Sequence, residues 1–123
     1  MKLRVARHTN NLQAVIDFYT GLLGLQILGN FAGHDGYDGV FIGLPDMDWH
    51  LEFTVSNEAP IHQPDEDDLL VFYPENNATF DSMMEIINKA GITEITAKNT
   101  YWQLNGKTFV DPDGYRVVIA IKR

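Results

Sequence analysis

An imidazole and a carboxylate stand two positions apart in the segment His50-Leu51-Glu52. On a β-strand, residues i and i+2 share a face, so both side chains would point the same way. Two donors fall short of the roughly three protein ligands that a catalytic metal needs, and the sequence contains no HxH or HExxH pattern. The pair therefore favours the wall of a ligand-binding site. The alternative is a histidine at a rim beside a buried, paired glutamate.

Arg4 and His8 form a second pair, four residues apart in a strand expected over residues 3–9. This spacing places both side chains on one face. The arginine would bind an anionic group or pair with a carboxylate, and the imidazole would donate to or accept from a ligand. A partly exposed histidine near a helix start is the alternative for His8.

Aromatic rings are the third group of candidates. Tyr101, with Trp49 and Trp102, falls on or beside expected strands, where it would stack on a flat or cationic ligand or pack in a core or dimer contact. Tyr37 lies in the glycine-rich segment 29–39, which we expect to be a loop. It would act as a lid over a ligand or lie on a mobile surface loop. The segment has no lysine and no phosphate-loop spacing, which argues against nucleotide binding.

The elements that must position these residues occur twice in the same order, as a strand, a helix and then about three strands. Asn10 or Asn11 can cap the first helix, and Gly24 and Gly91 can end the two helices. The sequence Asn105-Gly106 predicts a hairpin turn. The expected strands cover residues 3–9, 25–28, 40–44 and 49–55 in the first half, and 69–73, 92–97, 101–104, 107–110 and 115–121 in the second.

The acidic, proline-containing segment between the halves has little periodicity and predicts a linker. We divide the chain of 123 residues into module 1 at about 1–58, a linker at about 59–67 and module 2 at about 68–123. The predicted fold class is α+β, with two βαβββ modules that form a curved sheet around a concave pocket and helices outside. Such a space is a natural ligand site.

Composition excludes several classes of function. The net charge of −8 would repel nucleic-acid phosphates and anionic membranes and would weakly favour a basic ligand. Without cysteine the chain has no disulfide, thiolate nucleophile or zinc–thiolate site. No stretch resembles a membrane span or a signal peptide, so a cytoplasmic location is the expectation.

Three segments carry a family resemblance: "NNLQAVIDFYTGLLGLQIL", "INKAGI" and "FVDPDGYRVVI". Together they resemble the helix opening, the second helix end and the closing turn and strand of the vicinal oxygen chelate superfamily. That superfamily contains glyoxalase I, extradiol dioxygenases, fosfomycin-modifying enzymes and bleomycin-resistance proteins. The resemblance covers nearly the whole chain. It implies the fold far more specifically than the function, since this fold hosts many chemistries.

Metal-using members of that superfamily place one ligand on each of four strands. The resemblance assigns these positions to Arg4, to Glu52, to Asp68 or Leu69, and to Val118. An arginine has no lone pair to give a cation, and a valine has no donor atom. We therefore predict no metal ligand and no catalytic residue. We also expect that Arg4 replaces the charge of the metal and pairs with Glu52.

The resulting prediction is a small-molecule binding protein without a complete metal site, one that sequesters a bulky or basic compound as a homodimer. Two alternatives remain: a metal-dependent lyase or dioxygenase that holds a divalent metal through Glu52 and His8, and a structural or partner-binding domain. The predicted ligand-binding residues are Arg4, His8, Tyr37, His50, Glu52, Phe72, Tyr101 and Val118.

Overall fold

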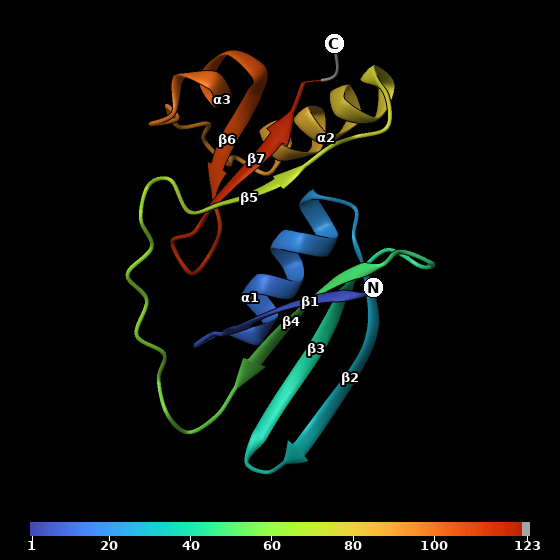
Figure 1. Ribbon diagram of the computed structural model, residues 1–123, viewed down its shortest axis with the longest axis vertical. Helices are drawn as coiled ribbons and strands as arrows, with labels where there is room; N and C mark the ends of the chain where they lie inside the picture. The colour runs from blue at the N-terminus through green and yellow to red at the C-terminus, as the bar shows by residue number, and fades with distance from the viewer. Residues whose placement is uncertain (122–123) are drawn as a thin grey trace. The chain divides into compact units, whose positions relative to one another are not determined.

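The structure, a computed structural model, describes residues 1–121 and divides into two compact units, Met1–Ile61 and His62–Arg123 (Figure 1). Each unit combines one sheet with helices, which confirms the α+β class and the two-module organisation that the sequence predicts. The boundary falls in the irregular segment between Val55 and Leu69. None of the described helices has the length and apolar character required to cross a bilayer.

The first unit is a four-stranded sheet in the order β1-β4-β3-β2, with β1 parallel to β4 and the other neighbours antiparallel. Its elements are β1 (Leu3–His8), α1 (Leu12–Ile16), the π-helix η1 (Asp17–Leu22), β2 (Gln26–His34), β3 (Tyr37–Gly43) and β4 (Trp49–Val55). Asn11 caps α1, because its side-chain oxygen accepts from the Ala14 N–H at 3.0 Å. Gly24, at φ 71°, takes the left-handed conformation that ends the helical segment.

Side chains along β4 point alternately into the core and to the opposite face of the sheet. Leu51 and Phe53 are buried, at 5% and 1% exposure, and the Phe53 ring stacks on Tyr19 of η1 with ring centroids 5.1 Å apart. Buried Val40 and Ile42 of β3 belong to the same core. The helical segment therefore covers one face of the sheet, and the alternate residues of each strand form the other face.

The glycine-rich segment is a β-hairpin, so our expectation of a loop over residues 29–39 was wrong. Strands β2 and β3 pair from Gln26–Gly43 to His34–Tyr37. The chain turns at Asp35 and Gly36, both at positive φ. Tyr37 is consequently the first residue of β3 and not a loop residue.

The second unit is a three-stranded sheet in the order β5-β7-β6. Its elements are β5 (Leu69–Phe72), α2 (Asn77–Lys89), α3 (Thr100–Asn105), β6 (Gly106–Val110) and β7 (Arg116–Ala120). Ile95 forms an isolated antiparallel bridge to Thr108, with Ile95 N–H donating to the Thr108 carbonyl at 2.9 Å. Including this bridge, the unit repeats the strand order of the first unit, with its second strand reduced to one residue.

The strand expected at 101–104 and the hairpin turn at Asn105-Gly106 were also wrong. Residues 100–105 form α3, and Asn99 caps it by accepting from the Tyr101 N–H at 3.0 Å. Asn105 ends this helix and Gly106 starts β6 directly. Spacing of Tyr101, Trp102 and Leu104 fits a short helix as well as a strand, and the cap at Asn99 was the overlooked signal.

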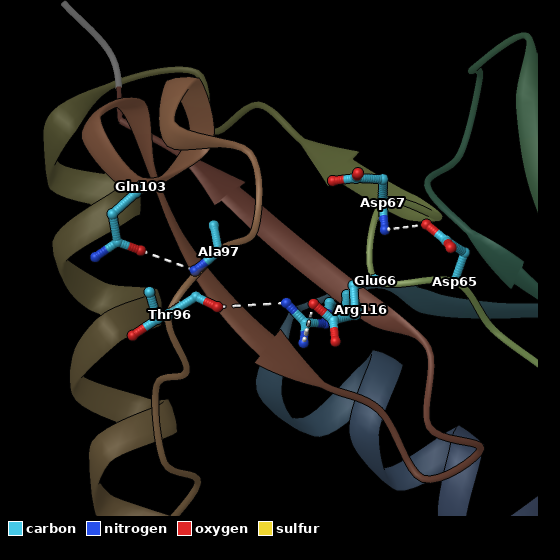
Figure 2. A network of polar contacts seen from close by, with 7 residues as sticks. All are labelled: Asp65, Glu66, Asp67, Thr96, Ala97, Gln103 and Arg116. Carbon is cyan, nitrogen blue, oxygen red and sulfur yellow. Dashed lines mark hydrogen bonds and ion pairs between the residues drawn. The ribbon is translucent and has the colours of Figure 1, made fainter.

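Two turns of the second unit are held by aspartate side chains. In the predicted turn before β7, Asp111 Oδ1 accepts from the N–H groups of Asp113 and Tyr115 at 2.9 and 3.0 Å. In the acidic run before β5, Asp65 Oδ2 accepts from the Asp67 N–H at 2.8 Å (Figure 2). Arg116 lies beside this run, with its Nη2 3.8 Å from Glu66 and its Nη1 donating to the Thr96 carbonyl at 3.3 Å.

Candidate ligand-binding site

The face of the first sheet opposite the helices carries most of the predicted site residues, and we call it the polar face. Strand pairing aligns its residues in three rows that run across the sheet from β1. The rows are Arg4, His50, Gly43 and Gln26; then Ala6, Glu52, Phe41 and Gly29; then His8, Thr54, Gly39 and Phe31. Directly paired residues of neighbouring strands point to the same side, so all of these share one surface.

Arg4 joins the first two rows through three contacts of its guanidinium. Its Nε donates to His50 Nε2 at 2.9 Å, its Nη1 lies 3.7 Å from Glu52 Oε2, and its Cζ lies 4.7 Å from the centre of the Phe41 ring. Because His50 accepts at Nε2, its imidazole is neutral and carries its proton on Nδ1. The Arg4 side chain is 51% exposed and that of Glu52 only 15%.

The donor set of the polar face does not fit a divalent cation. Glu52 and His50 both direct their acceptor atoms at the guanidinium of Arg4, whose positive charge is fixed. A cation near Glu52 would be repelled by Arg4 about as strongly as it is attracted by the carboxylate. Within residues 1–121, no three His, Cys, Asp or Glu side chains are grouped closely enough to hold a metal ion.

His8 is held at the end of the third row by hydrogen bonds to both ring nitrogens. Nδ1 lies 2.8 Å from Thr54 Oγ1, and Nε2 lies 3.0 Å from both Ser56 Oγ and the Glu58 carbonyl oxygen. The carbonyl can only accept, so Nε2 carries a proton and donates to it. To ligate a metal, His8 would have to give up one of these bonds. Tyr37 packs edge-on against His8, with ring centroids 5.7 Å apart.

Phe72, Tyr101 and Val118 lie in the second unit, and that unit does not bring them together. Phe72 pairs with Ile119 and Val118 pairs with Val71, so Phe72 and Val118 point to opposite faces of the sheet. Val118 is 0% exposed. Tyr101 lies on α3, where it is 59% exposed and packs against Trp102 with ring centroids 4.9 Å apart.

Sequence reasoning missed Phe31 and Phe41, two neighbouring rings of the polar face on β2 and β3. The signal was present as a two-residue period, with Gly29 and Phe31 on β2 and Gly39, Phe41 and Gly43 on β3. Glycines are depleted in strands, and we therefore assigned this segment to a loop. If this segment is taken as two strands, side chains two residues apart share a face, and both rings then lie on the same side of the sheet.

Comparison with known proteins gives the family. The sequence profile of the YycE-like N-terminal domain matches residues 3–54, and that of the YycE-like C-terminal domain matches residues 67–120. The uncharacterised protein YycE of Bacillus subtilis is 42% identical over 120 residues, which are 95% of this chain and 85% of that protein. The chain belongs to the YycE family.

The crystal structure of a YycE protein of unknown function from Bacillus subtilis superposes with a TM-score of 0.86 at 40% identity, covering 99% of this chain and 90% of that one. Glyoxalase I of Leishmania major, a trypanothione-dependent enzyme, gives 0.75 at 21% identity, over 98% and 85% of the two chains. TnmS3, an antibiotic binding protein from a Streptomyces species, gives 0.70 at 18% identity, over 98% and 93%. These likenesses confirm the vicinal oxygen chelate fold.

Proposed function

We propose that this YycE-family chain is a small-molecule binding protein that works without a divalent metal. The observation that supports the proposal most directly is the guanidinium of Arg4, which hydrogen-bonds His50 and lies 3.7 Å from Glu52. Arg4 and Glu52 stand at two of the positions where the superfamily resemblance expects metal ligands. A side chain that neutralises Glu52 without a metal leaves the polar face suited to binding rather than to Lewis-acid chemistry.

A small-molecule site needs apolar contacts and polar contacts, and the polar face offers both. Phe31 and Phe41 supply apolar surface, and both are partly exposed. Arg4 supplies an exposed charged donor beside them. TnmS3, described as an antibiotic binding protein, has the same fold, so binding alone is a use to which this fold is put.

Two charges of the protein could select the ligand, and they act over different distances: the net charge of the chain and the charge of Arg4. The net charge of −8 favours a basic compound at long range, but salt screens that attraction beyond about 8 Å under physiological conditions. At contact distance the more exposed charged group is Arg4, at 51% against 15% for Glu52. The local contact therefore favours an acidic group over the basic compound that composition alone suggests.

A thermal-shift screen with a library of metabolites and antibiotics, followed by calorimetric titration of hits, tests the proposal. A ligand at 100 times its Kd should stabilise the protein by about 2.7 kcal/mol. We expect a hit that stabilises equally with and without EDTA and whose effect is lost in Arg4→Gln. The control is Lys89→Gln, because Lys89 pairs with Glu85 on α2 of the second unit.

Two results would contradict the proposal. No hit at all would favour a structural or partner-binding domain. A hit abolished by EDTA and restored by Ni, Zn, Mn or Fe would favour the metal-dependent lyase or dioxygenase. The homodimer belongs to the same proposal, and light scattering tests it through a mass of twice the 13.9 kDa of one chain.

A further inference from the structure

Glycine faces an aromatic ring at each of three paired positions on the polar face. Gly29 pairs with Phe41, and Gly39 pairs with Phe31, across β2 and β3. Gly43 pairs with His50 across β3 and β4. Paired residues point to the same side of a sheet, so the position beside each ring carries no side chain.

Those glycines allow the rings to lie directly on the neighbouring backbone. A Cβ on Gly39 would lie 2.3 Å from Cζ of Phe31, and a Cβ on Gly29 would lie 3.4 Å from Cδ2 of Phe41. Gly43 differs, because a Cβ there would lie 3.2 Å from Cδ1 of Leu28 and 3.3 Å from the His50 Cβ, and no ring lies over that glycine. Gly39 and Gly43 are buried, while the rings beside them remain partly exposed. Gly29 and Gly39 thus keep the two phenylalanine rings low on the sheet.

We call Phe31, Phe41, His50 and Arg4 the aromatic platform. The Phe31 and Phe41 centroids are 5.7 Å apart with their planes at 42°, and the Phe41 and His50 centroids are 5.9 Å apart at 80°. The Arg4 guanidinium lies over Phe41, the middle ring, with its Cζ 4.7 Å from the ring centroid. Its Nε and Nη1 face His50 and Glu52, and within residues 1–121 its Nη2 has no hydrogen-bond partner.

We propose that the aromatic platform binds a planar aromatic acid, with its ring system against Phe31 and its carboxylate accepting a hydrogen bond from Arg4, which lies over Phe41. A Phe31 ring held low over Gly39 and partly exposed offers a flat apolar contact, which suits a planar ligand. Nη2 of Arg4, which faces neither His50 nor Glu52, can donate a charge-assisted hydrogen bond to a carboxylate oxygen. Glu52 and His50 act as positioning residues that fix the guanidinium. This inference rests on the proposed function and names its ligand class.

The test uses 2-naphthoate as the probe, titrated into the full-length protein by fluorescence and calorimetry. Neutral 2-naphthamide and the saturated decahydro-2-naphthoate are the comparators. A charge-assisted hydrogen bond predicts about a 10-fold preference for naphthoate over naphthamide. Aromatic contact predicts about a 5-fold preference over the saturated acid.

Substitutions then test the contributions of Arg4 and of the Phe31 ring to binding one at a time. Arg4→Gln should abolish the preference for the acid over the amide and leave naphthamide binding within about 2-fold. The double variant Arg4→Gln/Glu52→Gln should behave like Arg4→Gln. Recovery of naphthoate binding in the double variant would contradict the inference, because it would show that the single variant lost binding through repulsion by the unpaired Glu52 and not through the loss of a donor to the ligand.

Gly39→Ala should weaken all three probes by about 10-fold, because the new methyl group displaces the Phe31 ring. Its matched control is Gly21→Ala, since a Cβ on Gly21 has no neighbour within 4 Å. Circular dichroism confirms folding of each variant, and Phe31→Leu replaces Gly39→Ala if that variant does not fold.

Equal affinity for naphthoate and naphthamide would overturn the inference, as would equal effects of Gly39→Ala and Gly21→Ala. If no probe binds while the library screen finds another ligand, this inference fails and the proposed function stands. If neither the probes nor the library binds, both fail.

Discussion

Arg4 satisfies at once three groups that would otherwise need separate partners: the acceptor nitrogen of His50, the carboxylate of Glu52 and the face of the Phe41 ring. A carboxylate that is 15% exposed is costly to leave unpaired. The arginine removes this cost with a charge that it cannot lose by deprotonation. One residue therefore connects three strands of the polar face, β1, β3 and β4.

Thr108 presents the opposite case, a buried polar atom without a partner. The residue is 2% exposed, and among the described residues its Oγ1 has no hydrogen bond. Thr108→Val replaces the hydroxyl with a methyl group of similar size, so we expect the free energy of unfolding to rise by about 1 kcal/mol. Urea denaturation measures it.

Thr20→Val is the matched control, because the Thr20 hydroxyl donates to the Ile16 carbonyl at 2.6 Å. That variant should lose about 1 kcal/mol. If both valine variants destabilise the protein equally, the Thr108 hydroxyl is satisfied and this account of it is wrong.

At the scale of elements, the second sheet depends on a close approach between β6 and β7. A Cβ on Gly106 would lie 2.6 Å from Cγ1 of Val118 and 3.1 Å from the Ile119 carbonyl oxygen. Gly106 has extended backbone geometry, at φ −164°, so the constraint comes from packing and not from backbone conformation. Glycine here allows α3 to pass directly into β6 against Val118.

Gly106→Ala should therefore lower the free energy of unfolding by about 1–3 kcal/mol through overpacking. Gly21→Ala, where nothing lies within 4 Å of the added Cβ, serves as the control and should not destabilise. Chemical denaturation of both variants and the wild type gives the comparison. A loss in Gly106→Ala no larger than that in Gly21→Ala would show that β6 and β7 can separate without cost.

Elements with a strong local signal could be predicted from the sequence. The cap at Asn11, the left-handed glycines Gly24 and Gly91, and the turn at Asp111 to Gly114 each have a local physical cause and were found correctly. Segments 29–39 and 100–105 were assigned wrongly because their structure is set by packing. Glycines paired with rings resemble a loop, and a six-residue helix resembles a strand.

The candidate site was predictable only in part for the same reason. Strand period places Arg4 with His8, and His50 with Glu52, but no local rule fixes which strands pair. The contact between Arg4 and the other two side chains depends on the parallel pairing of β1 with β4, where Arg4 lies opposite His50. Within the second unit, Phe72, Tyr101 and Val118 do not lie together, because Phe72 and Val118 have opposite strand parity and Tyr101 lies on a helix.

At the scale of the whole molecule, the chain repeats one strand order in two units and specialises them differently. The first unit has four full strands and a polar face. In the second, a single bridge at Ile95 stands where the corresponding strand would be, and Val118 of β7 is buried. Two of the four positions that the superfamily resemblance gives to metal ligands, Arg4 and Val118, thus carry residues that cannot ligate.

Metal content measures the central claim most directly. The protein is purified without chelator, dialysed against Ni, Zn, Mn and Fe, and analysed by inductively coupled plasma mass spectrometry. We expect less than one equivalent of metal per chain, because the charge of Arg4 cancels the attraction of Glu52 for a cation. Arg4→His, analysed in parallel, removes the fixed charge and should raise retention. One equivalent of metal bound per wild-type chain, and lost in Glu52→Ala, would contradict the account.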